Sequence, residues 1–205
     1  MKNYKFTENW FTDDNWSESI KFDKTKELHF LEIGSFEGMS TIWFLENYLK
    51  NENSTITCID PWLNYSQNED SYNSYFKTEN QWNFKNSNVK STFLFNIVEY
   101  GEANKVHIEQ GFSHEILAKL MGNEKKYDLI LIDGNHTAPF VISDAVLSWH
   151  LLKVGGFMIF DDYLWFLDRK ETLTPKLSVD SFIRIFSDYL EVIGGSSTKI
   201  IKKIK

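Results

Sequence analysis

The chain has 205 residues, which is enough for one domain that buries a continuous core without disulfides or structural metals. Hydrophobic residues make up 42% and charged residues 25%, values that exclude a disordered or fibrous protein. The net charge of −7 argues against nucleic-acid binding, because such binding relies on clustered lysine and arginine. The single cysteine, Cys58, cannot form an intramolecular disulfide, and no Cys/His cluster has zinc spacing. We therefore expect a reducing, cytoplasmic location.

Neither terminus has the pattern of a targeting or membrane segment. Met1–Trp16 lacks a basic start followed by an apolar run, so it is not a secretory signal. No stretch approaches the roughly 20 apolar residues needed to cross a bilayer. The lysine-rich end, Lys199–Lys205, alternates charged and apolar residues, which predicts an edge strand with solvated lysines. Contact of this segment with a membrane is a weaker alternative.

Short apolar runs alternate with stretches of helical spacing along most of the chain, which is typical of a parallel α/β sheet. The predicted strands are His29–Ile33, Thr55–Ile59, Lys105–Glu109, Asp128–Ile132 and Phe157–Phe160. The predicted helices are Ser40–Lys50, Ser91–Tyr100, Ser113–Leu120 and Pro139–Leu152. In the last helix, Val141, Ala145, Trp149 and Leu152 form one apolar stripe, which we interpret as core packing.

The end of the chain departs from this alternation. Val179–Tyr189 has helical spacing, and the runs Leu190–Ile193 and Thr198–Ile204 predict two strands. Because only the Gly194–Ser197 turn separates these strands, they must run antiparallel. The polar, aromatic stretch of residues 64–88 has no clean period and is interpreted as an insertion or lid. We find no repeat and no dividing linker, so residues 1–205 are predicted to form a single domain.

Two glycines, Gly34 and Gly38, follow the first predicted strand and precede a helix. Glycine allows a tight turn and a close ligand, and the free N–H groups of a helix start favour polar or anionic groups. Strand-to-helix turns also use glycine for structural reasons alone. Phe36 stands where the middle glycine of a G-x-G-x-x-G motif would be, which disfavours a dinucleotide pyrophosphate.

Candidate ligand-binding residues also follow the second and third strands. Asp60 lies 22 positions after Gly38 and ends the second strand, where a carboxylate can accept both hydroxyls of a ribose. The alternative is that Asp60 is a turn residue or a helix cap. The third strand is followed by Gln110–Ser113, which could present a backbone N–H and a flat side chain to an adenine. Ser113 could equally be the N-cap of the next helix.

The E-x-G-x-x-x-G loop, Asp60 and the closing hairpin resemble class I S-adenosylmethionine-dependent methyltransferases. The resemblance covers Leu28 to the C-terminus and leaves residues 1–27 as an N-terminal extension. It implies a Rossmann-like, doubly wound, mostly parallel seven-stranded sheet with an antiparallel C-terminal strand, and S-adenosylmethionine as cofactor. The cofactor-binding residues that it implies are Glu32, Gly34, Ser35, Gly38, Ser40, Asp60, Trp62, Gly111, Phe112, Ser113 and Asp133.

Four further runs resemble one branch of these enzymes, methyltransferase family 24. They are Ile132–His136, Asp144–Trp149, Gly155–Gly156 and Phe160–Tyr163. Relatives in this branch include catechol, caffeoyl-CoA and macrolide-sugar O-methyltransferases. The resemblance therefore implies methyl transfer to a hydroxyl group of a small molecule.

Three carboxylates end neighbouring strands independently of any family. Asp133 follows the fourth strand, and Asp161 and Asp162 follow the fifth, at the edge where ligands of parallel sheets bind. Converging carboxylates repel one another unless a cation lies between them, and hard oxygen ligands suit Mg²⁺ or Mn²⁺. We predict a metal site formed by these three residues. The alternative is that Asp161 and Asp162 cap a loop or pair with a lysine.

His136 lies three residues after Asp133 in the loop that leaves the same strand. Its position suits a general base that acts with Asp133 on a metal-held hydroxyl, and histidine in general has a pKa near 6.5, in the range such a base needs. The alternatives are that His136 caps the next helix or binds the metal itself. In the sugar-methylating relatives a histidine at this spacing is the implied base, whereas catechol-type enzymes place a lysine there. The pair Asp161-Asp162, in place of Asp-Asn, also implies a sugar or glycan acceptor.

Aromatic residues could supply the walls of an acceptor pocket, or they could form a small satellite core. They are Trp62, Tyr65, Tyr72, Tyr75, Phe76, Trp82, Tyr163 and Trp165. Two other functions compete with methyl transfer. A nicotinamide oxidoreductase is disfavoured by the missing middle glycine and by the lack of a Tyr-x-x-x-Lys pair. A non-catalytic binding module would have no use for a complete metal-and-base set. We expect a small-molecule or sugar partner, and the sequence leaves self-association into a homo-oligomer open.

Overall fold

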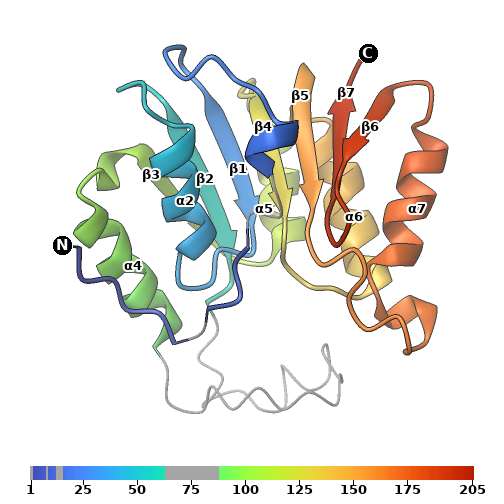
Figure 1. The fold of residues 1–205 in the computed structure, drawn as a ribbon, viewed down its shortest axis with the longest axis horizontal. Coiled ribbons are helices and arrows are strands. Elements are labelled where there is room, and N and C mark those ends of the chain that lie inside the picture. Colours follow the sequence, from blue (N-terminus) through green and yellow to red (C-terminus); the bar gives the residue numbers. More distant parts are fainter. Residues whose placement is uncertain (1, 8, 13–15, 63–87) are drawn as a thin grey trace.

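Seven strands form one sheet in the order β3-β2-β1-β4-β5-β7-β6 in the computed structural model (Figure 1). The structure describes residues 2–7, 9–12, 16–62 and 88–205. The strands are β1 (His29–Ile33), β2 (Thr55–Asp60), β3 (Val106–Gln110), β4 (Tyr127–Ile132), β5 (Leu152–Phe160), β6 (Leu190–Gly194) and β7 (Lys199–Lys203). Strands β1 to β5 pair in parallel, and β7 is antiparallel to both of its neighbours. The predicted fold class is confirmed.

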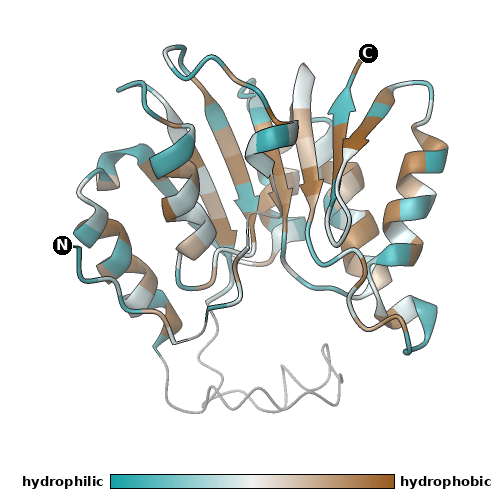
Figure 2. Cartoon of the chain, viewed as in Figure 1, coloured by the Kyte–Doolittle hydropathy of each residue, from teal (hydrophilic) through white to brown (hydrophobic). Residues whose placement is uncertain are grey.

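Helices cover both faces of this sheet. They are α1 (Trp16–Ser19), α2 (Met39–Asn47), α4 (Val89–Tyr100), α5 (Ser113–Met121), α6 (Ala138–Trp149) and α7 (Lys176–Ile185), with short 3-10 turns at Ala103–Lys105 and Glu171–Leu173. One core cluster joins α1, α2 and α4 to one face, and a second joins α5, α6 and α7 to the other. Neighbouring strand residues such as Phe30 and Leu31 belong to opposite clusters, as the two-residue period of a strand requires. Figure 2 shows apolar residues concentrated on the strands between these layers.

The lysine-rich end of the chain does not form the edge strand that its composition predicts. Strand β7 lies between β5 and β6, and β6 is the edge. Ile200 and Ile201 are fully buried on opposite faces of the sheet. The lysines are accommodated because their long side chains reach polar partners, and Lys203 donates to the carbonyls of Trp149 and Leu152. Alternating charge therefore marks a central strand here.

The fourth predicted helix is shorter than its apolar stripe suggests. Helix α6 ends at Trp149, and Leu152 begins β5 rather than extending the stripe. Val141, Ala145 and Trp149 do pack together in the core, as predicted. Leu152 lies in the same core cluster but belongs to β5, so its apolar character alone did not show where the helix ends.

The N-terminal extension contributes to the domain core. Trp16 and Ile20 are fully buried against α2 and the sheet. Residues 2–7 and 9–12 run along the carboxyl edge of the strands beside α2 and α4 (Figure 1). The predicted lid, residues 64–88, lies outside the described residues except for Asn88, whose side chain caps α4. No helix within the described ranges is long and apolar enough to cross a membrane.

Candidate active site

Gly34 brings the tips of β1 and β4 into direct contact. Its φ of 89° lies in the left-handed region, and a Cβ atom at this position would lie 2.0 Å from the carbonyl oxygen of Asp133. The Asp133 backbone N–H donates to the Ile33 carbonyl at 2.8 Å, which fixes the same approach. Gly38, with a φ of 85°, caps α2 and packs against Phe93. The glycine loop is thus held directly beside the first predicted metal ligand.

Glu32 and Ser40 lie beneath this loop rather than on its open side. The Glu32 carboxylate is completely buried and accepts hydrogen bonds from the hydroxyls of Ser40, at 2.6 Å, and Thr41. Burial raises the pKa of Glu32 above its ordinary value, against the lowering effect of these hydroxyl donors. Ser35 is likewise buried. These residues, predicted to bind cofactor, brace the start of α2 and therefore shape the loop from below.

Asp60 joins the tip of β2 to the glycine loop. One carboxylate oxygen accepts the Phe36 backbone N–H at 3.0 Å, and the other accepts the Trp62 backbone N–H at 2.7 Å. Burial raises the pKa of Asp60 to about 6, although both backbone donors act to lower it. Each carboxylate oxygen can accept a second hydrogen bond, so the turn-forming role does not prevent binding of a ribose.

Trp62 lies in the core behind the loop. It is 5% exposed, its indole N–H donates to the Phe36 carbonyl at 2.8 Å, and its ring lies 4.9 Å from that of Phe93. This packing favours the alternative that Trp62 belongs to a small satellite core. The aromatic residues predicted between positions 65 and 82 lie outside the described residues.

The tip of β3 lies next to that of β2, because the Gly111 backbone N–H donates to the Asp60 carbonyl at 3.1 Å. Phe112 is the N-cap of α5, so the N-cap alternative for Ser113 is wrong; Ser113 is the first helical residue. Its hydroxyl lies close to the carboxylate of Asp144 in α6, which is 2% exposed. Burial raises the pKa of Asp144 to about 7. Sequence reasoning missed this contact, because the two residues are distant along the chain.

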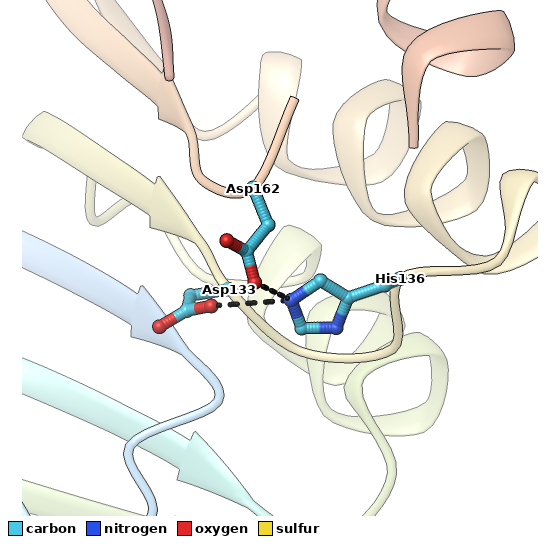
Figure 3. Close-up of side chains that lie close together, drawn as sticks. All are labelled: Asp133, His136 and Asp162. Atoms are coloured by element: carbon cyan, nitrogen blue, oxygen red, sulfur yellow. Dashed lines mark ion pairs between the residues drawn. The ribbon is translucent and has the colours of Figure 1, made fainter. Parts of the chain in front are cut away.

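Three side chains from the loops after β4 and β5 converge on one point (Figure 3). The Nε2 atom of His136 lies 2.7 Å from an oxygen of Asp162 and 3.7 Å from an oxygen of Asp133. One ligand atom from each residue lies within 4.8 Å of the other two. The backbone at Asp162 has a φ of 51°, a conformation that aspartate tolerates better than most residues. Two of the three predicted metal ligands therefore meet, and His136 completes the group.

Asp161 lies close by but outside this group of three. It lines the same pocket as Asp133 and His136, together with Asn135 and Pro175. The pKa of Asp133 is raised well above its ordinary value, first by burial and then by the charges of Asp161 and Asp162. The carboxylates thus repel one another as predicted, although Asp161 does so from a different position.

The donor set fits a divalent cation. Two carboxylates and an imidazole supply hard oxygen ligands and a nitrogen ligand, and a positive ion would relieve the repulsion at Asp133. The Nε2 atom of His136 is buried and, among the described residues, contacts Asp162 without the geometry of a hydrogen bond. An atom in this state is available to a ligand or a proton. The fit applies to any ion that accepts oxygen and nitrogen ligands.

Neighbouring residues fix the His136 loop. The side-chain oxygen of Asn135 accepts both the backbone N–H and the hydroxyl of Thr137, each at 2.8 Å. Thr137 is the N-cap of α6, so the alternative that His136 caps this helix is wrong. The Trp165 ring lies 4.8 Å from the His136 ring and 4.3 Å from Phe166. An aromatic surface therefore adjoins the charged group, where Trp165 was predicted to contribute.

The strand order, the glycine loop and the acid after β2 together define the class I methyltransferase fold. A family model described as a methyltransferase domain matches residues 31–163, more than half of the chain. The chain belongs to this family, methyltransferase family 24.

Known proteins extend this comparison. Over 139 residues the chain is 31% identical to the uncharacterized protein R132 of Acanthamoeba polyphaga mimivirus, covering 67% of the chain and 52% of that relative. The chain thus spans about half the length of this relative. An O-methyltransferase from Bacillus cereus, solved in complex with SAH, has a TM-score of 0.62 at 15% identity, covering 86% of this chain and 74% of that one.

A second similar structure is the MycE methyltransferase of the mycinamycin biosynthetic pathway, solved with Mg, SAH and mycinamycin VI. Its TM-score is 0.57 at 11% identity, covering 89% of this chain and 46% of that one. At these identities both structural likenesses concern the fold alone.

Proposed function

We propose that this chain is an S-adenosylmethionine-dependent O-methyltransferase that uses a divalent metal, Mg²⁺ or Mn²⁺, to methylate a sugar or glycan hydroxyl. The observation that carries the proposal is the contact between Gly34 and Asp133. It joins a loop of the type that cradles this cofactor to a cluster of side chains that could hold a metal ion. A methyl donor and a metal-held acceptor would therefore lie next to each other, as methyl transfer requires.

The cofactor half of the proposal rests on three strand tips. Gly34 and Gly38 have left-handed backbone conformations and carry no side chain that would obstruct a ligand close to the loop. Asp60 can accept hydrogen bonds from ribose hydroxyls. The backbone of Gly111 and Phe112 follows β3, beside Asp60. Family membership and the SAH found with the Bacillus cereus protein support the same cofactor.

The catalytic half rests on Asp133, His136 and Asp162. A bound divalent cation would lower the pKa of an acceptor hydroxyl. His136 would then take the proton at Nε2, and the nearby Asp162 carboxylate would stabilise the resulting imidazolium. Asp133 and Asp162 would hold the cation. The alternative is that His136 is itself a metal ligand. Mg²⁺ affinity distinguishes the two roles: replacing His136 would weaken Mg²⁺ binding if His136 is a ligand and would leave it unchanged if His136 is a base.

A sugar acceptor is favoured over a catechol by two features. The pair Asp161-Asp162 adds a carboxylate where catechol-type relatives have an amide, and a histidine stands where they have a lysine. The half-buried Trp165 beside His136 offers a flat apolar surface of the kind on which a sugar ring can stack. The MycE structure, with Mg and mycinamycin VI, is a precedent within this fold.

A methyl-transfer assay tests the proposal. The purified chain is incubated with radiolabelled S-adenosylmethionine and two panels of acceptors, one of sugars and glycosides and one of catechols. We expect transfer to members of the sugar panel, its loss in excess EDTA, and its return with Mg²⁺ or Mn²⁺. Transfer to sugars that persists in EDTA would contradict the metal role, and transfer to catechols alone would contradict the acceptor. Cofactor binding without transfer to either panel would favour a non-catalytic binding module.

A further inference from the structure

The described part of the N-terminal extension is bonded to the glycine loop through Glu37. Both the backbone N–H and the hydroxyl of Thr7 donate to the Glu37 carboxylate, at 2.7 and 3.0 Å. Glu37 immediately precedes Gly38 and is 1% exposed. A buried carboxylate without such donors would be costly, so Thr7 and Glu37 hold each other in place.

Asn96 makes a second connection from α4. Its fully buried side chain accepts the Lys5 backbone N–H at 2.7 Å and donates to the Lys5 carbonyl at 2.7 Å. The same amide nitrogen donates to the Glu37 carbonyl at 2.9 Å. One side chain thus pairs with both backbone groups of Lys5, as a neighbouring strand would, and also binds the glycine loop.

Trp10 forms the third contact, and it reaches the centre of the loop. Its ring stacks on Phe36 with centroids 5.3 Å apart and planes 25° from parallel. Phe36 has a φ of 43°, which is strained for a residue with a large side chain. In this conformation its backbone N–H donates to Asp60. Such a conformation persists only where surrounding contacts maintain it.

We propose that Thr7, Trp10, Glu37 and Asn96 are positioning residues for the cofactor. They hold the N-terminal extension against the glycine loop, and the extension in turn keeps Phe36 in the conformation that places its N–H on Asp60. The inference rests on the proposed cofactor site and adds a segment that precedes the 31–163 family match. Trp10 is 49% exposed and does not belong to the core cluster, which makes it a suitable position for substitution.

Two substitutions test the inference in the full chain. Trp10→Ala removes the stacking on Phe36, and Thr7→Val removes one hydrogen bond to Glu37 while keeping the backbone donor. Thr7→Ser is the conservative variant that should restore the bond. Tyr189→Ala is the matched control, because Tyr189 is also 49% exposed and lies at the start of the edge hairpin. We measure the Kd for SAH by calorimetry, the KM and kcat of transfer, and hydrogen exchange at the Phe36 and Gly38 amides.

We expect Trp10→Ala and Thr7→Val each to raise the Kd for SAH by about three- to tenfold, the usual range for one aromatic pair or hydrogen bond. The KM for S-adenosylmethionine should rise similarly, kcat should change less than twofold, and the loop amides should exchange faster even without cofactor. Thr7→Ser and Tyr189→Ala should match the wild type.

Wild-type affinity and wild-type exchange in both test variants would overturn this inference and leave the proposed function intact. An equal loss of affinity in Tyr189→Ala would also overturn it, because the effect would then be general. Failure of the unmodified chain to bind SAH would instead overturn the proposed function. In that case, hydrogen exchange at the Phe36 and Gly38 amides of the variants and the wild type alone decides whether the N-terminal extension fixes the glycine loop.

Discussion

The His136 imidazole contacts Asp133, Asp162 and Trp165 and belongs to the charged group rather than to the glycine loop, so its role can be tested apart from cofactor binding. Replacing His136 with Ala should lower kcat by about 10²- to 10⁴-fold, the usual share of general base catalysis. The Kd for SAH should stay within twofold of the wild type. Unchanged turnover in this variant would exclude His136 as the base. A large loss of Mg²⁺ affinity, measured by calorimetry, would identify it as a metal ligand.

Asp60 predicts a pH dependence of cofactor binding. Its pKa in the folded chain is about 6, and ribose hydroxyls donate best to the ionised carboxylate. The affinity for SAH should therefore be constant above about pH 7 and fall by about tenfold per pH unit below about pH 6. Calorimetry from pH 5 to pH 8 measures this. Asp60→Asn should bind more weakly at every pH and lose this dependence; a pH-dependent affinity in that variant would assign the effect to another group.

Residue types at strand ends allowed much of the site to be predicted. Asp133 and Asp162 could be placed together because the ends of neighbouring parallel strands meet. The sequence left open that His136 binds the metal, but it did not show that Asp161 lies outside the cluster, because this depends on the left-handed backbone at Asp162. The hydrogen bond between Ser40 and Glu32 and the closeness of Ser113 to Asp144 could not be predicted either, since each pair joins separate elements.

Among the secondary-structure elements, β7 shows how a central strand can carry several lysines. The free energy of unfolding should fall by about 2–5 kcal/mol for Ile200→Ala, because removal of this fully buried side chain leaves a cavity in the core against β7. Val192→Ala on the edge strand β6 is the control and should cost less than about 1 kcal/mol, because Val192 is 47% exposed. Urea unfolding measures both. Equal costs would contradict the central position of β7.

Asp144 adjoins three elements, because it lies in α6, close to Ser113 in α5, and faces Gly134 after β4. Its pKa is raised to about 7 in the folded chain, so the unfolded chain holds fewer protons between about pH 4 and pH 7. The carboxyl group therefore lowers the free energy of unfolding as the pH rises through this range. Asp144→Asn should be more stable than the wild type at pH 8, by roughly 1–3 kcal/mol, and this advantage should shrink towards pH 5. Urea unfolding at both pH values checks this; a loss of stability at pH 8 would show that the charged form is favoured.

Element types were predictable because the hydrophobic period changes between strands and helices, and β1 has the predicted bounds. The boundary between α6 and β5 could not be predicted, because Trp149 and Leu152 belong to one apolar run that continues across a short turn. The position of β7 within the sheet was also hidden. The hairpin alone does not determine which of its two strands pairs with β5.

At the scale of the whole molecule, the sheet brings the two halves of the proposed site together at one edge. The glycine loop and Asp60 follow β1 and β2, and the charged group follows β4 and β5. Their junction is the contact between Gly34 and Asp133. The sequence indicated this architecture through its alternation of elements and its family resemblance. It gave no sign that the N-terminal extension supplies core residues such as Trp16 and bonds to the loop, because no periodic pattern marks those contacts.

Calorimetric titration of the chain with S-adenosylmethionine, with and without Mg²⁺, tests the central claim most directly. We predict saturable binding at one site per chain, weakened at least tenfold in Asp60→Ala and unchanged in Tyr189→Ala. Absence of binding heat in both conditions, at several temperatures, would contradict the assignment of this chain as an S-adenosylmethionine-dependent methyltransferase.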